Sequence, residues 1–160
     1  MLSLLSQFFP YNWIGVLAAA FTSFIFSFIY FSAIFGRLFS KYSNFTPKDY
    51  QNFSKRSFPS LLKHNFFTEI LTSIAVCICI LYLRAETLEE VLKIVMGIWL
   101  AFILPSSVAP VLWENEHVVH SLISLGHRFG ALSIQGVIFF LFANLNRYAH
   151  ELELIEPIAA

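Results

Sequence analysis

The chain has 160 residues and a formal net charge of zero, with 58% apolar residues, 12% charged residues and 19 phenylalanines. Soluble domains carry roughly 25% charged residues, so this composition leaves too few charges to cover a water-facing surface. A neutral chain also has no basic field to collect nucleic acid. The composition therefore predicts a single transmembrane domain over residues 1–160, with the lipid bilayer as its surroundings.

Four runs of the sequence are apolar enough to cross a hydrocarbon layer of roughly 30 Å, which takes about 20 helical residues. They lie at about residues 13–35, 66–83, 92–113 and 118–144. A polar loop over residues 36–65 joins the first two runs, and the other links are short. Short links favour antiparallel neighbours, so we expect an all-α fold, an integral membrane four-helix bundle.

The first span divides into two faces. Small residues recur every four positions on one face, at Gly15, Ala19, Ser23 and Ser27. Because small side chains let helix backbones approach closely within lipid, we expect this face to pack inward. Most phenylalanines of the span fall on the opposite face, and we expect them to meet lipid or a membrane-protein partner.

The polar loop carries most of the basic residues, since six of the ten Lys and Arg residues lie within residues 36–65. An excess of positive charge marks loops on the cytoplasmic side of a membrane. We therefore predict a multi-pass protein with this loop on the cytoplasmic or matrix side and both termini on the opposite side.

The third span contains two prolines, Pro105 and Pro110, in the stretch LPSSVAP. Each proline removes a backbone donor and clashes with the preceding turn, so we expect the helix to break or kink there. Transporters use such breaks as binding sites. A kink that serves only packing is the simpler interpretation.

The fourth span combines a packing pattern with a polar stripe. Gly126 and Gly130 form a G-x-x-x-G, a pattern of helix contact in membranes. Ser124, Arg128 and Gln135 lie almost opposite these glycines on the helical wheel. Because lipid disfavours polar groups, we expect the stripe to face the bundle interior or a wet cleft.

Arg128 always carries its charge and therefore needs a partner or water inside the span. An unpaired arginine at the bilayer centre costs at least about 2.5 kcal/mol. Helical side chains tilt toward the helix start, which in the predicted topology draws Arg128 toward the side of Glu69. We expect an Arg128–Glu69 contact, direct or through water. The alternative is that both side chains reach out to the membrane interface.

Histidines gather on one predicted side of the membrane, and the weak candidates for a metal or haem site are His64, His120 and His127. No H-E-x-x-H or C-x-x-C motif and no tight ligand spacing accompanies them. We therefore expect no cofactor and no metal. The sequence also lacks a nucleophile–histidine–acid motif and a glycine-rich phosphate loop, so we expect neither an enzyme nor catalytic residues.

Three stretches of the sequence are similar to those of one family of small membrane proteins. NWIGVLAAAF is similar to its Asn-aromatic-x-x-Val opening and alanine-rich first helix, and IYFSAIFGRLF to the exit from that helix. Residues 97–139 are similar to its third and fourth helices, with His127 where the family tends to have Tyr and Gln135 where it tends to have Met. Over residues 12–142 the chain thus resembles domain of unknown function 1761. The resemblance implies a four-helix membrane fold without an established activity, and it supplies no catalytic residues.

These features favour a non-enzymatic membrane protein that acts through partners, as an accessory or structural subunit of a larger membrane assembly or as a homo-oligomer. The short links and the phenylalanine face of the first span support this interpretation. The alternative is a small proton- or solute-coupled transporter or channel that uses Glu69 and Arg128. A haem- or metal-binding protein built on the histidines is the third hypothesis.

Overall fold

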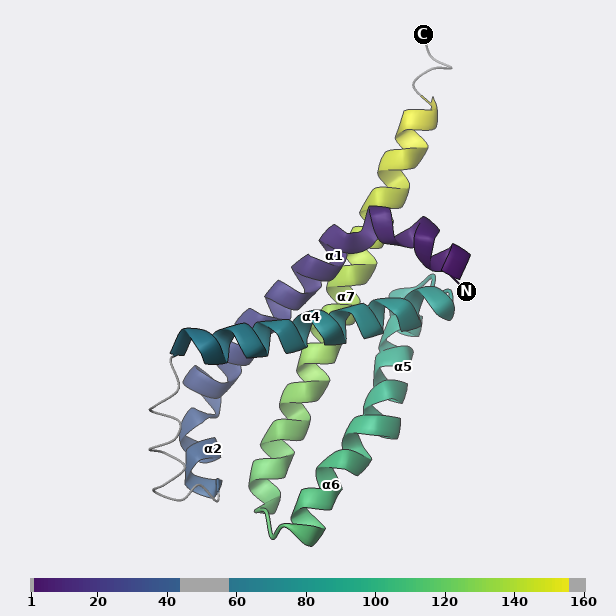
Figure 1. The fold of residues 1–160 in the computed structure, drawn as a ribbon. Helices are drawn as coiled ribbons and strands as arrows, with labels where there is room; N and C mark the ends of the chain where they lie inside the picture. The colour runs from purple at the N-terminus through teal and green to yellow at the C-terminus, as the bar shows by residue number, and fades with distance from the viewer. Residues whose placement is uncertain (1, 44–57, 156–160) are drawn as a thin grey trace.

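The computed structural model describes residues 2–43 and 58–155, with side chains described for residues 13–43, 60 and 62–145. Within these residues every regular element is helical (Figure 1). Much of the predicted polar loop therefore lies outside the described residues. The predicted all-α class is confirmed.

Four helices of the described chain are long and apolar enough to cross a membrane, judged by length and composition. The predicted membrane fold is thus confirmed at this level. The candidate spans are Trp13–Ile34, Leu62–Tyr82, Leu88–Trp113 and Val118–Leu145.

Two of these spans change their helical type along their length, because each contains a short π-helical segment in which hydrogen bonds reach back five residues instead of four. In chain order the described elements are α1 (Leu2–Ile29), the π-helical η1 (Tyr30–Ile34), α2 (Gly36–Tyr42), α4 (Phe58–Tyr82), α5 (Leu88–Ile98), the π-helical η2 (Trp99–Ile103), α6 (Leu104–Trp113) and α7 (Val118–Ile155).

The long helix α7 contacts every other long helix of the fold. Helices α1, α4 and α7 all pack on one another, while α5 lies against α7 and α4. Figure 1 shows α4 crossing α1 and α7, with the start of α1 and the end of α7 toward one end and the α6–α7 link at the other. The place where α1, α4 and α7 meet contains the buried polar residues described below.

The tight turn between α4 and α5 follows from local hydrogen bonding. Arg84 adopts a left-handed backbone conformation with φ 52°. The N–H of Ala85 then reaches back to the carbonyl of Ile80 at 3.1 Å, as in a Schellman-type helix end. Thr87 caps α5 and forms a capping box with Glu90. The chain therefore reverses within a few residues, which sets α5 beside α4.

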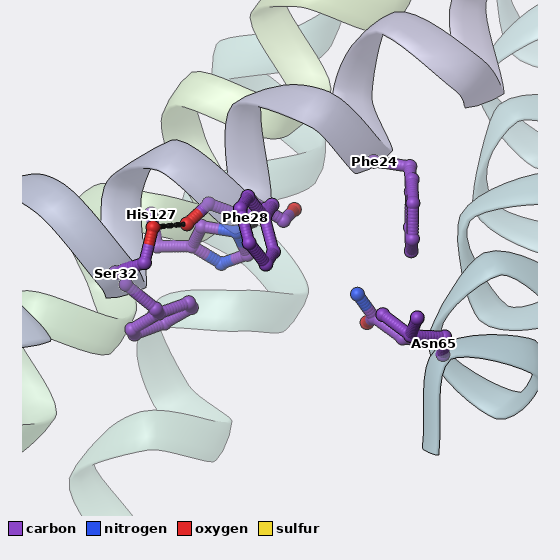
Figure 2. Close-up of a pocket in the computed structure, with 8 residues that line it drawn as sticks. Phe24, Phe28, Ser32, Asn65 and His127 are labelled. Atoms are coloured by element: carbon purple, nitrogen blue, oxygen red, sulfur yellow. Dashed lines mark hydrogen bonds between the residues drawn. The ribbon is translucent and has the colours of Figure 1, made fainter. Parts of the chain in front are cut away.

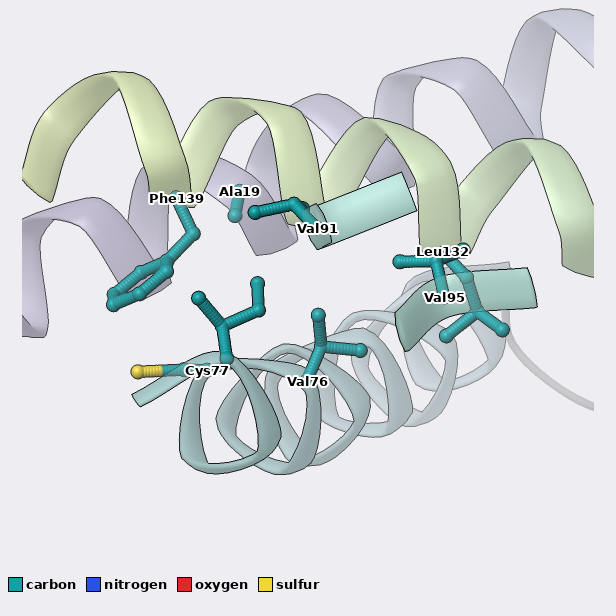
Figure 3. Packing of buried hydrophobic residues seen from close by; sticks show 8 residues of the cluster. Ala19, Val76, Cys77, Val91, Val95, Leu132 and Phe139 are labelled. Carbon is teal, nitrogen blue, oxygen red and sulfur yellow. The ribbon is translucent and has the colours of Figure 1, made fainter. Parts of the chain in front are cut away.

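An apolar core fills the space between α4, α5, α7 and α1 (Figure 3). Gly136 lets α5 approach α7, because a methyl group at this position would lie 3.0 Å from Val91 Cγ1 and 3.1 Å from Val95 Cγ2. The buried members of the core are Ala19, Val76, Cys77, Ile80, Val91, Val95, Leu132 and Phe139.

The proline stretch of the third span lies directly after η2. Pro105 stands at the start of α6 and Pro110 lies inside it. The hydroxyl groups of Ser106 and Ser107 both donate to the carbonyl of Ile103, each at 2.9 Å. The structure thus places a π-helical turn before the first proline, and the kink expected at the two prolines stays a prediction.

Both π-helical segments begin with an aromatic residue that donates a hydrogen bond to the backbone of α7. The Tyr30 hydroxyl donates to the carbonyl of Ile123 at 3.0 Å. The Trp99 Nε1–H donates to the carbonyl of Leu125 at 3.1 Å. The first and third spans are therefore attached to α7 at nearly the same level.

Candidate functional site

Glu69 is the buried acidic residue among the described side chains, with 8% of its surface exposed. It lies on the face of α4 that packs against α1 and α7. The next turn of this face carries Ser73, which is also buried and donates to the carbonyl of Val16 in α1 at 2.9 Å. The face of α4 that carries Glu69 and Ser73 is therefore directed into the bundle.

Three neutral side chains from two other helices bind the Glu69 carboxyl group. Ser23 Oγ donates to Oε2 at 2.7 Å, and Ser27 Oγ lies 3.1 Å from Oε1. Gln135 Nε2 donates to Oε2 at 2.8 Å and lies 3.3 Å from the Glu69 carbonyl oxygen. All three partners are buried. Glu69 is thus held by hydroxyl and amide groups alone, since the ion pairs of the described residues involve other acids.

Ser27 connects this carboxyl group to a histidine. His127 Nε2 lies 2.8 Å from Ser27 Oγ. The same oxygen is 3.1 Å from Glu69 Oε1 and 2.9 Å from the carbonyl of Ser23. A hydroxyl has one proton to donate, so Ser27 donates to one of these acceptors at a time. Donation to Glu69, with a proton on His127 Nε2, forms a continuous hydrogen-bonded row from the ring to the carboxyl group.

The imidazole ring of His127 is fixed by aromatic residues of the first span. The ring of Phe26 is stacked on it, with a centroid separation of 5.8 Å and an interplanar angle of 5°. Phe31 lies against it at 4.5 Å, and Tyr30 at 5.3 Å. These contacts hold the histidine toward Ser27.

The glycine pattern of α7 accommodates these rings. A methyl group at Gly130 would lie 2.7 Å from Cζ of Phe26, and one at Gly126 would lie 3.1 Å from the hydroxyl oxygen of Tyr30. The close approach predicted for this pattern is therefore made between the α7 backbone and α1 side chains. The expected inward face of the first span is also buried, and at its far end Gly15 approaches Phe142.

A cavity of about 300 Å³ lies beside this row of His127, Ser27 and Glu69, between α1, η1, α4 and α7. Ser27 and His127 line it on one side, so the cavity adjoins the hydrogen-bonded row. Figure 2 shows the rings of Phe24 and Phe28 on the α1 side and the amide of Asn65 reaching toward the space from α4. The candidate site thus consists of the buried carboxyl group of Glu69, the hydrogen-bonded row through Ser27 to His127, and a cavity at the His127 end of that row.

Among the described residues the structure contains no direct ion pair between Arg128 and Glu69, and a contact through water stays a prediction. Arg128 is exposed, and the ion pairs found in the described part of the chain do not include it. The reason is the crossing of the helices: Gln135 lies where α4 meets α7, and Arg128 is seven residues, or about 10.5 Å, along the helix axis from it. The predicted polar stripe is therefore divided, with Gln135 buried, Ser124 half-buried and Arg128 exposed.

The three histidines considered as metal ligands have separate environments. His64 Nδ1 lies 2.7 Å from the carbonyl of Ser60. His120 pairs with Glu116, whereas His127 contacts Ser27. Over the residues described, no group of three or more His, Cys, Asp or Glu side chains is placed to hold a metal ion. The structure thus does not bring these histidines together.

Sequence reasoning missed the role of two small residues. Ser23 and Ser27 were expected only to allow close packing, yet their hydroxyl groups bind Glu69. The signal was the use of serine instead of alanine or glycine one helical turn apart on a face directed inward. A buried hydroxyl needs a partner, and the acid in the second span was the available one.

Comparison with known proteins identifies one family for the chain. A family model with the description "Protein of unknown function (DUF1761)" matches residues 14–140 of the chain. This match confirms the resemblance inferred from the sequence. Neither the curated proteins nor the solved structures include a match to the chain.

Proposed function

Since the chain belongs to the DUF1761 family, whose description names no function, we propose a function from the geometry around Glu69. The protein takes up and releases a proton at Glu69 and uses this exchange to move a small solute through the membrane. Its four apolar helices support a membrane location.

The observation that carries the proposal is the chemical nature of the partners of Glu69. Hydroxyl and amide groups can donate to an ionised carboxylate and can also accept a hydrogen bond from a protonated carboxylic acid. An arginine or lysine partner can only donate, and it favours the ionised form. Ser23, Ser27 and Gln135 can therefore satisfy both protonation states of Glu69.

The amide of Gln135 supports the same conclusion. Its Oε1 is a buried polar atom without a hydrogen-bond partner in the described structure. Leaving such an atom unpaired costs about 1–3 kcal/mol. When Glu69 is protonated, a half-turn of the amide brings Oε1 to the carboxyl group, where it accepts the new hydrogen bond. The unpaired oxygen thus gains a partner in the second protonation state, in exchange for the two bonds that Nε2 makes to Glu69 in the first.

A route for the proton is provided by Ser27 and His127. The two successive separations are 2.8 Å from His127 Nε2 to Ser27 Oγ and 3.1 Å from Ser27 Oγ to Glu69 Oε1. A proton received by the histidine from the cavity can pass to the hydroxyl while the hydroxyl proton passes to Glu69. Arg128 has no part in this route.

Infrared difference spectroscopy in nanodiscs tests the proposal directly. Spectra recorded at about pH 5 and about pH 8, a range that brackets physiological conditions, should contain a carboxylic acid C=O band that is present at the lower pH. The band should be absent from Glu69→Gln, which keeps the size of the side chain. Glu89→Gln is the matched control, because the Glu89 side chain is 77% exposed, and it should keep the band. Identical difference spectra for the wild type and Glu69→Gln would refute proton exchange at this residue.

The accessory-subunit hypothesis is retained as the second candidate because of the third span. Only 6% of its most apolar stretch is buried within the described chain, against 28–33% for the other three spans. Lipid or a protein partner can cover this surface. The mass of the protein in nanodiscs distinguishes the two, since a subunit should purify with a partner in fixed stoichiometry and a self-contained carrier should not.

A further inference from the structure

The cavity beside His127 is lined in large part by aromatic rings, with the polar side chains of His127 and Asn65 among its other lining residues. Three phenylalanines of the first span, Phe24, Phe28 and Phe31, form much of its wall. Its volume of about 300 Å³ is at the lower limit of typical pockets for small molecules, about 300–1,000 Å³. A flat aromatic body of one ring suits such a wall, because aromatic rings pack edge-to-face or offset on one another.

Two polar groups of the cavity have hydrogen-bonding capacity left over. His127 uses Nε2 toward Ser27, and no described residue bonds its Nδ1. The Asn65 amide reaches toward the cavity from α4 (Figure 2) and likewise has no described partner. The π-helical η1, which contributes Phe31 and Ser32 to the lining, is an independent sign, because such segments occur frequently at functional sites.

The charges around the cavity favour an uncharged ligand. None of the lining side chains is an acid, a lysine or an arginine. On α4, Glu69 is buried and separated from the cavity by Ser27, while the side chains of Lys63 and His64 are exposed and do not line the cavity. On α7, Arg128 follows His127 and is exposed; the α1 span has no acidic or basic residue. No lining side chain carries an opposite charge for an anion or for a cation, so the desolvation of either ion would be uncompensated.

We propose that this cavity binds a small, uncharged phenol, whose ring packs on the phenylalanines and whose hydroxyl bonds His127 Nδ1 and the Asn65 amide. A phenolic hydroxyl both donates and accepts, so it fits His127 in either tautomer. The hydroxyl becomes the next group in the row from Glu69 through Ser27 and His127. The cavity can bind a phenol whether or not Glu69 exchanges a proton, and only the link between the phenol and proton movement rests on the proposed function.

Equilibrium binding of radiolabelled probes to nanodisc-embedded protein tests the proposal, with empty nanodiscs subtracted. Four probes share one body: para-ethylphenol, ethylbenzene, para-ethylbenzoate and para-ethylbenzylammonium. Two hydrogen bonds predict that para-ethylphenol binds roughly 5- to 100-fold more tightly than ethylbenzene. The two charged probes should bind more weakly than the phenol. Equal binding of the phenol and ethylbenzene, or tightest binding of a charged probe, would overturn the proposal.

Two variants locate the polar end. His127→Phe keeps an aromatic ring against Phe26 and Phe31, and Asn65→Leu keeps the side-chain shape. Each should lower the preference for the phenol over ethylbenzene by about 2- to 10-fold while ethylbenzene binding is kept. Asn144→Leu, on α7 and outside the cavity lining, is the matched control and should leave the preference unchanged. An unchanged preference in both cavity variants would place the phenol elsewhere and refute the site.

Two further measurements complete the test. Competition by a long-chain phenol shows whether the natural ligand is membrane-anchored or free, and the Glu69 infrared band tests the proposed function independently of phenol binding. Displacement by para-dodecylphenol assigns the site to the ring of a membrane-anchored phenol, whereas its failure to compete assigns the site to free phenols. Phenol binding without an infrared band from Glu69 refutes proton exchange and keeps the cavity site. The band without phenol binding does the reverse.

Discussion

Replacing Gly130 by alanine should destabilise the protein through a single contact. The new methyl group would lie 2.7 Å from Cζ and 3.0 Å from Cε1 of Phe26, whereas carbon atoms in contact are about 3.5–4.0 Å apart. The ring must therefore move by about 1 Å. Its motion is restricted because His127 is stacked on it. Overpacking of this kind costs about 1–3 kcal/mol, and the better helix propensity of alanine offsets up to about 1 kcal/mol of it. We therefore expect Gly130→Ala to lower the free energy of unfolding by about 1–2 kcal/mol.

A double-mutant cycle in mixed micelles, with reversible unfolding by a denaturing detergent, measures this contact. In the Phe26→Leu background the smaller side chain leaves room for the methyl group, so most of the loss caused by Gly130→Ala should disappear. Gly97→Ala is the control, since a methyl group there meets nothing within 4 Å, and its better helix propensity predicts a gain of up to about 1 kcal/mol. An equal loss for Gly130→Ala in both backgrounds would refute the assigned clash with Phe26.

Three further variants test the carboxyl cluster and its surroundings. Gln135→Leu should lower the free energy of unfolding by about 1.5–3 kcal/mol, because it removes the amide donor from Glu69; a loss below about 0.5 kcal/mol in the same detergent titration would contradict this contribution. Arg128→Gln should change the unfolding free energy by no more than about 0.5 kcal/mol, since the side chain is exposed; a loss above about 2 kcal/mol would instead support the ion pair with Glu69 that the sequence suggested. Ser27→Ala should slow the protonation of Glu69 after a rapid pH change at least about tenfold, followed by the carboxyl infrared band. Ser23→Ala, which removes a hydroxyl outside the route from His127, is its control, and equal rates for the two variants would argue against this route.

Composition and hydrophobic run length were sufficient to predict the membrane fold. Residues in a bilayer must satisfy their backbone polar groups internally, so long apolar runs leave helices as the main solution. The inward position of Ser23 and Ser27 could likewise be predicted, because small residues at four-residue spacing mark a packing face. These signals are local, and a single sequence contains them.

The partners of Glu69 could not be predicted in the same way. The helical wheel places Arg128 and Gln135 about 20° apart, and it cannot tell which of them lies at the crossing with α4. That choice depends on the level at which two helices cross, a long-range property that no local pattern records. The charge of Arg128 suggested an ion pair, whereas the crossing brings the amide to the acid.

The two aromatic donors at the start of η1 and η2 also determine how α7 can move. Tyr30 and Trp99 hold carbonyl groups that are two residues apart in α7, or about 3 Å along its axis. Sliding by one turn, about 5.4 Å, would break both hydrogen bonds, whereas tilting about this level would keep them. α7 would then pivot around the Ile123 and Leu125 carbonyl groups. His127 lies close to this pivot point, whereas Gln135 lies about 15 Å from it along the helix axis. Under the proposed function, rocking of α7 would open the Gln135 side of the carboxyl group while the His127 side stays closed, which is one of the two states that alternating access needs.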